Sequence, residues 1–164
     1  MIKPIALIGF YGSGKTTLGR RVANELNMPF SELSKEMEKI SGMRLHNLYD
    51  NMGESVFRKF ESLALSSLAA SGGVVVTTGG CIMLPYNRRL LSENFFSFYI
   101  DTPFELTTAD ASYPSIKNLT QIELQKLYDM RKPLYTESAD HILDGSLPSE
   151  QLQSAIIDLA LAGV

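Results

Sequence analysis

The stretch GFYGSGKT at residues 9–16 follows directly on the short apolar run IALI at residues 5–8. A continuous apolar run that ends at a glycine is typical of a strand buried on both faces of a parallel sheet. Leu18, Val22 and Leu26 then have the spacing of one apolar helix face. The eight residues match the pattern G-x-x-x-x-G-K-[ST], which has meaning when a strand precedes it and a helix follows. Residues 9–16 therefore predict a phosphate-binding loop.

The residue types in this loop suit a nucleotide. Glycines let successive backbone N–H groups point at phosphate oxygens, and the helix that begins near Lys15 adds a favourable dipole. Lys15 would reach the β and γ oxygens, and the Thr16 hydroxyl would help to hold Mg²⁺. The candidate nucleotide-binding residues are Gly12, Ser13, Gly14, Lys15, Thr16 and Thr17. The alternative is a tight glycine-rich turn with a solvated lysine.

The rest of the chain alternates apolar runs with stretches of helical spacing. Further strand candidates lie at residues 74–76, 95–100 and, more weakly, 141–143. Thr120 and Glu123 have the spacing of a capping box, and Pro148 precedes a last predicted helix. This alternation predicts an α/β fold, a three-layer α/β/α sandwich with a parallel sheet. Its ligand site is expected beyond the carboxyl ends of the strands.

Composition limits the class of protein. A length of 164 residues suits one domain spanning residues 1–164, and 45% hydrophobic with 20% charged residues is an ordinary globular balance. The net charge of −3, without a run of Lys or Arg, disfavours a nucleic-acid partner. No apolar stretch is long enough for a membrane span or a signal-peptide core. Cys81 has no cysteine to pair with, which fits a reducing, cytoplasmic location.

Several motifs beyond the phosphate loop resemble the shikimate kinase family in order and spacing. They are Gly53–Arg58 with Glu61, Thr78–Gly80, Asn87-Arg88, and Arg131–Tyr135 with Ala139-Asp140. The guanine-reading motif N-K-x-D is absent, which disfavours a switch GTPase. The resemblance implies a five-stranded parallel sheet, a substrate-binding helical region at about 32–61 and a lid at about 109–119. It also implies a small monomeric kinase that uses ATP and Mg²⁺.

The resemblance further implies which residues bind the substrate, a small carboxylate that bears hydroxyl groups. Arg58 and Arg131 match the family's carboxylate-binding arginines, whose paired N–H donors suit a carboxylate. Gly79 and Gly80 match the glycine turn that approaches the substrate ring. Two alternatives stay open: Arg58 could form a surface pair with Glu61, and Arg131 could cap the end of its helix.

The chain departs from the family pattern where the family has Asp-x-Asp. It has Glu32, Leu33 and Ser34 there. Glu32 keeps a carboxylate for the metal. Ser34 is the candidate for the second, catalytic position, where it could hydrogen-bond a substrate hydroxyl but not act as a base at neutral pH. Ser34 could instead be the N-cap of the next helix.

The lid and the glycine turn also depart from the family pattern. Tyr113 stands where the family has the lid arginine that reaches the transferring phosphate. Thr108 and Ala109 stand where the family usually has an adenine-stacking arginine. Lys117 either substitutes for the lid arginine or is a solvated loop lysine. Cys81 replaces a third glycine, and a small buried thiol is favoured there over a nucleophile.

These observations predict an ATP- and Mg²⁺-dependent kinase of the shikimate kinase type, with shikimate as the first candidate substrate. A positioned base contributes about 10² to 10⁴ in rate, and an arginine on the transferring phosphoryl group about 10³ to 10⁵ in related systems. The substitutions therefore suggest reduced activity. The alternatives are a relative with a different hydroxy-carboxylate substrate and a nucleotide-binding module that has lost catalysis.

Overall fold

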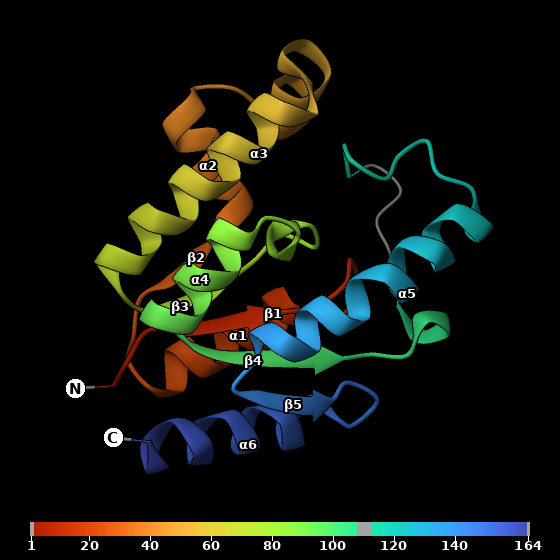
Figure 1. Cartoon of the computed structure of the whole chain (residues 1–164). Coiled ribbons are helices and arrows are strands. Elements are labelled where there is room, and N and C mark those ends of the chain that lie inside the picture. Colours follow the sequence, from red (N-terminus) through yellow and green to blue (C-terminus); the bar gives the residue numbers. More distant parts are fainter. Residues whose placement is uncertain (1, 108–112, 164) are drawn as a thin grey trace.

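A parallel five-stranded sheet organises the chain, with strand order β2-β3-β1-β4-β5. The computed structural model describes residues 2–107 and 113–163 (Figure 1). The elements are β1 (Ile5–Ile8), α1 (Lys15–Glu25), β2 (Phe30–Glu32), α2 (Leu33–Ser41), α3 (Leu45–Ser71), β3 (Val74–Val76), η1 (Cys81–Met83), α4 (Pro85–Asn94), β4 (Phe96–Asp101), η2 (Phe104–Leu106), α5 (Gln121–Ser138), β5 (His141–Asp144) and α6 (Ser149–Ala162). The predicted α/β class and five-stranded parallel sheet are confirmed.

The central strand β1 explains the three layers. It pairs in parallel with β3 on one side and β4 on the other, and all four of its residues are fully buried. Since side chains alternate along a strand, Ile5 and Leu7 pack with α1 and α6, whereas Ala6 and Ile8 pack with α3 and α5. Helices therefore cover both faces of the sheet, as Figure 1 shows.

Most predicted elements lie where the sequence placed them. The capping box at Thr120 and Glu123 is present, and α6 begins directly after Pro148. β4 begins one residue later than predicted, because the N–H of Phe95 still bonds to the carbonyl of Leu91 at the end of α4. The apolar runs alone did not reveal β2; the family resemblance supplied this fifth strand.

Two local features shape the region after β2. The predicted N-cap role of Ser34 is wrong, because α2 begins at Leu33 and Glu32 is the residue before it. Helix α3 is broken at Gly53, whose φ of 86° is in the left-handed region that favours glycine. After this break α3 continues as one helix to Ser71 and turns Arg58 and Glu61 into the protein.

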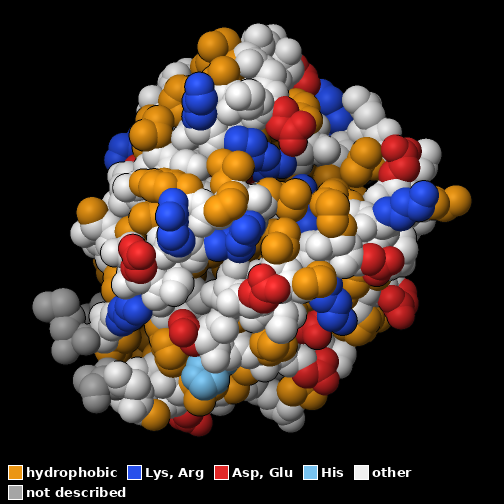
Figure 2. All heavy atoms as spheres, in the orientation of Figure 1, with side chains coloured by type: hydrophobic (Ala, Val, Ile, Leu, Met, Phe, Trp, Pro, Cys, Tyr) orange, Lys and Arg blue, Asp and Glu red, His pale blue; other side chains and the backbone are white. Residues whose placement is uncertain are grey.

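The surface is mixed in charge. Basic and acidic side chains are interspersed over the face shown in Figure 2, with apolar side chains between them. Among the helices that the structure describes, each is too short or too polar to cross a membrane.

Candidate active site

The phosphate-binding loop connects the carboxyl end of β1 to the N-terminus of α1. Gly12 and Gly14 have φ values of 71° and 87°, which L-residues with side chains rarely adopt. Gly14 is also the residue that precedes α1, so the turn leads directly into the helix. This geometry leaves backbone N–H groups of the loop and of the first helical turn free for an anion.

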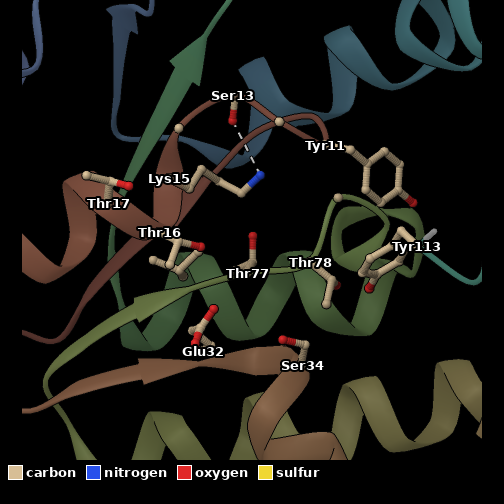
Figure 3. A pocket seen from close by; sticks show the side chains of 14 residues that line it. Tyr11, Ser13, Lys15, Thr16, Thr17, Glu32, Ser34, Thr77, Thr78 and Tyr113 are labelled. Carbon is tan, nitrogen blue, oxygen red and sulfur yellow. Dashed lines mark hydrogen bonds between the residues drawn. The ribbon is translucent and has the colours of Figure 1, made fainter. Parts of the chain in front are cut away.

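The loop forms one side of a cavity of about 410 Å³ (Figure 3), a size that suits a small-molecule site. The nucleotide wall is residues 12–17, and the acceptor wall is Ser34, Thr78, Gly79 and Tyr113. Tyr11, Glu32, Val76 and Thr77 complete the lining. All predicted nucleotide-binding residues therefore line one cavity together with Ser34 and Gly79. Gly80, Arg58 and Arg131 do not line it.

Lys15 lies inside the loop. Its side chain is buried, and its ammonium group donates hydrogen bonds to the carbonyl oxygens of Gly9 and Phe10 at 2.8 and 2.9 Å. A longer contact of 3.4 Å joins it to Ser13 Oγ, as Figure 3 shows. Burial lowers the pKa of Lys15 to about 7. A phosphate beside this group would favour its charged form. The alternative of a solvated lysine is wrong.

Thr16 and Glu32 face the same cavity and suit Mg²⁺. Within residues 2–107 and 113–163, no three His, Cys, Asp or Glu side chains come together as a metal site. Mg²⁺ does not need such a cluster, because it usually binds one or two protein groups, phosphate oxygens and waters. Glu32 also lies 3.5 Å from the exposed Arg20, and its own side chain keeps 22% of its surface accessible. Thr16 and Glu32 therefore fit the metal.

Glu61 joins the predicted substrate residues below the acceptor wall. It is fully buried, and it accepts hydrogen bonds from Arg58 Nη1 at 2.8 Å and from Thr78 Oγ1 at 2.5 Å. Burial of the guanidinium opposes its charge, yet Glu61 and Glu54 together raise the pKa of Arg58 above its ordinary value. The alternative of a surface pair is wrong, because Arg58 and Glu61 form a buried ion pair.

Arg58 also explains the glycine at position 80. A Cβ atom on Gly80 would collide with the guanidinium group of Arg58. The glycine turn and the arginine are therefore in direct contact, although neither residue lines the cavity. A larger residue at this position would displace Arg58 from Glu61.

Arg131 reaches the site through Tyr11. It is buried in the middle of α5, so its predicted alternative as a helix cap is wrong. Its Nη1 donates to the Tyr11 hydroxyl at 2.7 Å, and its Nε has no partner among the described residues. The Tyr11 ring in turn packs on Gly79, where a Cβ would come within 2.7 Å of it. Tyr11 therefore contacts two of the predicted substrate-binding residues.

Sequence reasoning missed the role of Tyr11. It occupies a variable position of the phosphate-loop pattern, where the pattern itself gives no signal. An aromatic residue beside a glycine turn was the available hint, since a large ring there must pack against a neighbouring element. Thr78 was likewise noted only as part of a motif, although its hydroxyl is held by Glu61.

The described part of the predicted lid, residues 113–119, packs against the site. The rings of Tyr113 and Tyr11 lie 4.9 Å apart between centroids, and Ser115 Oγ lies 3.0 Å from the Tyr11 hydroxyl. Lys117 pairs with Asp50 at 2.6 Å, so it neither enters the cavity nor stays free in solvent. Thr108 and Ala109 lie outside the described residues.

Cys81 has the properties of a structural thiol. It is buried at the start of η1, and burial raises the pKa of its thiol well above the ordinary value. A thiol that stays protonated is a poor nucleophile. The prediction of a small buried thiol is confirmed.

Comparison with known proteins shows the family to which the chain belongs. The family model described as shikimate kinase matches residues 11–160. A shikimate kinase of Zymomonas mobilis is 35% identical over 161 residues, covering 94% of this chain and 92% of the relative. One of Bordetella avium is 36% identical over 161 residues, covering 94% of this chain and 77% of the relative.

Solved structures give the same result. The shikimate kinase from Acinetobacter baumannii superposes with a TM-score of 0.88 at 29% identity, over 99% of this chain and 95% of the other. That from Aquifex aeolicus gives a TM-score of 0.83 at 30% identity, over 97% and 96% of the two chains. The chain belongs to the shikimate kinase family, and it is a phosphotransferase of that type that uses ATP, Mg²⁺ and an alcohol acceptor.

Proposed function

We propose that this chain transfers the γ-phosphoryl group of ATP to a hydroxyl group of shikimate or of a closely similar hydroxy-carboxylate. The observation that carries the proposal is the single cavity that joins the phosphate-binding loop to Ser34 and Thr78. The solved relative from Acinetobacter baumannii is a complex with shikimate, which supports this acceptor.

On the nucleotide wall, the loop N–H groups and the α1 N-terminus bind the phosphates of ATP. Lys15 leaves its loop carbonyls and donates to the β and γ oxygens, where its positive charge offsets the charge that develops during transfer. Thr16 and Glu32 would hold Mg²⁺, which would neutralise part of the charge of the ATP phosphates.

On the acceptor side, the substrate hydroxyl attacks the γ-phosphorus while the bond to the ADP oxygen breaks. Ser34 hydrogen-bonds this hydroxyl and orients it. Because a serine hydroxyl is not a base at neutral pH, the hydroxyl proton passes to the phosphoryl oxygens or to water. Transfer through a metaphosphate-like transition state needs little help from a base, so turnover continues at a reduced rate.

The carboxylate of the substrate binds near the glycine turn, between Arg58 and Arg131. The unpartnered Nε of Arg131 supports this assignment, since a buried N–H donor without an acceptor is costly. Arg58 keeps Glu61, and its guanidinium group lies directly against Gly80. Tyr11 lies against both Arg131 and Gly79, so its ring borders the place assigned to the carboxylate.

The decisive experiment is a coupled assay of ADP release with Mg·ATP and shikimate. Turnover well above the blank without shikimate supports the proposal, whereas saturable ATP binding without release for any hydroxy-acid contradicts it. That second result would indicate the nucleotide-binding module that has lost catalysis. Turnover with another hydroxy-acid but not with shikimate would indicate a shifted acceptor.

The proposal also includes the domain organisation, the oligomeric state and the location of the protein. The chain acts as one catalytic domain over residues 1–164, as a monomer in the cytoplasm, with the helical region at about 32–61 and the lid at about 109–119 enclosing the acceptor. Size-exclusion chromatography with light scattering tests the monomer. A mass of twice 18.2 kDa would contradict it.

A further inference from the structure

The Tyr113 hydroxyl is buried without a partner. It is shielded from solvent and forms no hydrogen bond of good geometry among the described residues, although the Thr78 side chain lies near it. Every tyrosine that is buried as a whole residue has a hydroxyl partner: Tyr11 with Arg131, Tyr99 with Asp101, Tyr128 with the carbonyl of Thr102, and Tyr135 with the carbonyl of Gly79. Tyr113 therefore differs from the other buried phenols, and its unused hydroxyl requires an explanation.

The position of the Tyr113 hydroxyl indicates what kind of atom would be its hydrogen-bond partner. Tyr113 lines the cavity, and Figure 3 shows it near Thr78 and on the opposite side from Thr17. Its ring is fixed by packing on Tyr11, and the next residues, Pro114 and Ile116, are buried. A fixed hydroxyl in the wall of a ligand cavity is suited to hydrogen-bond an atom of a bound ligand.

The charges around Tyr113 indicate an uncharged oxygen as the missing partner. Burial, reinforced by the nearby carboxylate of Glu61 and only partly offset by Arg58 and the Thr78 hydroxyl, raises the pKa of Tyr113 well above its ordinary value, so the group is a neutral donor. Ser34 and Thr78, its companions on the acceptor wall, are also neutral hydroxyl groups. The cationic side chain of this cavity, Lys15, belongs to the nucleotide wall. Neutral donors and acceptors in this arrangement suit the hydroxyl groups of a polyhydroxylated acid.

We propose that the Tyr113 hydroxyl donates a hydrogen bond to a hydroxyl oxygen of the acceptor substrate and thereby selects acceptors that carry this group. The proposal rests on the proposed function, since it assigns a residue to the acceptor side of the same reaction. A site built to hydrogen-bond a substrate hydroxyl rejects analogues without it, because its own polar group is then left unpaired. In place of the charged lid residue of the family pattern, the chain thus has a neutral residue that recognises a hydroxyl group of the acceptor.

The test is Tyr113→Phe, compared with Tyr128→Phe. Tyr128 is a buried phenol whose hydroxyl donates to the Thr102 carbonyl at 2.7 Å, and it does not line the cavity. Shikimate and cyclohexenecarboxylate, which keeps the ring and carboxylate but has no hydroxyl groups, are titrated into protein saturated with Mg·ADP. Mg·ADP itself is titrated separately, and the melting temperature of each ligand-free protein is measured.

Tyr113→Phe is expected to weaken shikimate binding about threefold to tenfold, the size of one neutral hydrogen bond. Its affinities for Mg·ADP and cyclohexenecarboxylate should not change. The melting temperature of the ligand-free variant should stay the same or rise, because the change removes an unsatisfied buried group. Tyr128→Phe should lower the melting temperature and leave shikimate binding unchanged.

Equal shikimate affinities of the Tyr113→Phe and unchanged proteins would overturn the proposal, and so would a loss confined to Mg·ADP. A lower melting temperature with unchanged shikimate binding would show a purely structural role and would also overturn it. These results leave the proposed function standing if ADP release continues. A wild-type protein that binds neither acid and releases no ADP with any hydroxy-acid would overturn both proposals.

Discussion

The two walls of the cavity are built in different ways. The nucleotide wall is one continuous segment, residues 12–17, and it offers mainly backbone N–H groups and the N-terminus of α1. The acceptor wall collects side chains from three separate parts of the chain, at Ser34, at Thr78 and Gly79, and at Tyr113. Backbone groups persist when side chains change, whereas each side-chain contact depends on one residue. The departures from the family pattern at Ser34 and Tyr113 accordingly fall on the acceptor wall.

The largest expected effect is on stability, and it comes from removing Glu61, which holds Arg58 and Thr78 below the acceptor wall. Glu61→Ala should lower the free energy of unfolding by about 3–5 kcal/mol, because it leaves the buried charge of Arg58 without its main partner. It also removes the acceptor of Thr78. Equilibrium unfolding in urea measures the change.

Glu93→Ala is the matched control, since Glu93 is exposed on α4 and should change stability by less than about 0.5 kcal/mol. A loss below about 1 kcal/mol for Glu61→Ala would mean that the acceptor wall does not depend on this buried pair.

The next effect concerns the one side chain on which the nucleotide wall depends. Lys15→Met should lower kcat by about 10²- to 10³-fold, the usual consequence of removing a group that stabilises transition-state charge. The ADP-release assay measures it. The fold should persist, because the glycine turn and α1 keep their backbone hydrogen bonds and methionine fills a similar buried volume.

Lys126→Met serves as the control, because Lys126 is exposed on α5. Equal kcat values for the Lys15 and Lys126 variants would show that transfer does not use the phosphate loop in the proposed way.

A gain of function would sharpen the comparison further. Ser34→Asp should raise kcat by about 10²-fold, the lower end of what a positioned base contributes, because the new carboxylate can accept the proton of the attacking hydroxyl. Ser34 already lines the cavity at the start of α2, so the replacement faces the acceptor.

Ser92→Asp on the exposed surface of α4 adds the same charge elsewhere. If Ser34→Asp binds ATP and shikimate as before but gains no rate over Ser92→Asp, the missing carboxylate is not what limits turnover. Tyr113→Arg combined with Ser34→Asp then tests whether the lid charge is the missing element.

The contrast between a contiguous nucleotide wall and an acceptor wall assembled from distant segments also explains how much of the site the sequence could predict. The phosphate loop is local: its glycine spacing, the strand before it and the helix after it are all contiguous, so Gly12 to Thr17 and the start of α1 could be placed from the sequence. The capping box at Thr120 is equally local. Such features need no knowledge of the tertiary structure.

The acceptor side depends on contacts between distant residues. Arg131 and Tyr11 are 120 positions apart, and nothing near either one indicates that they are hydrogen-bonded. Lys117 and Asp50, 67 positions apart, are a similar case. The sequence could therefore name Arg58 and Arg131 and suggest a pair of Arg58 with Glu61, but it could not show that this pair is buried or that Tyr11 lies beside Arg131.

The smallest expected effect is a pH dependence that separates the free from the nucleotide-bound state of Lys15. In the free protein burial lowers its pKa from 10.5 to about 7, so above pH 7 the folded chain holds this group neutral while the unfolded chain keeps it protonated. The contribution of Lys15 to stability therefore rises as the pH increases from about 7 towards 10.5.

A bound triphosphate favours the charged ammonium, so ATP binding above pH 7 takes up a proton, and ATP affinity should fall by up to about tenfold for each pH unit above 7. Calorimetric titrations at pH 7.5 and 8.5, each in two buffers of different ionisation enthalpy, measure the proton uptake and the affinity together. Lys15→Met should bind ATP weakly and without this uptake, whereas proton uptake that persists in Lys15→Met would assign the titration to another group.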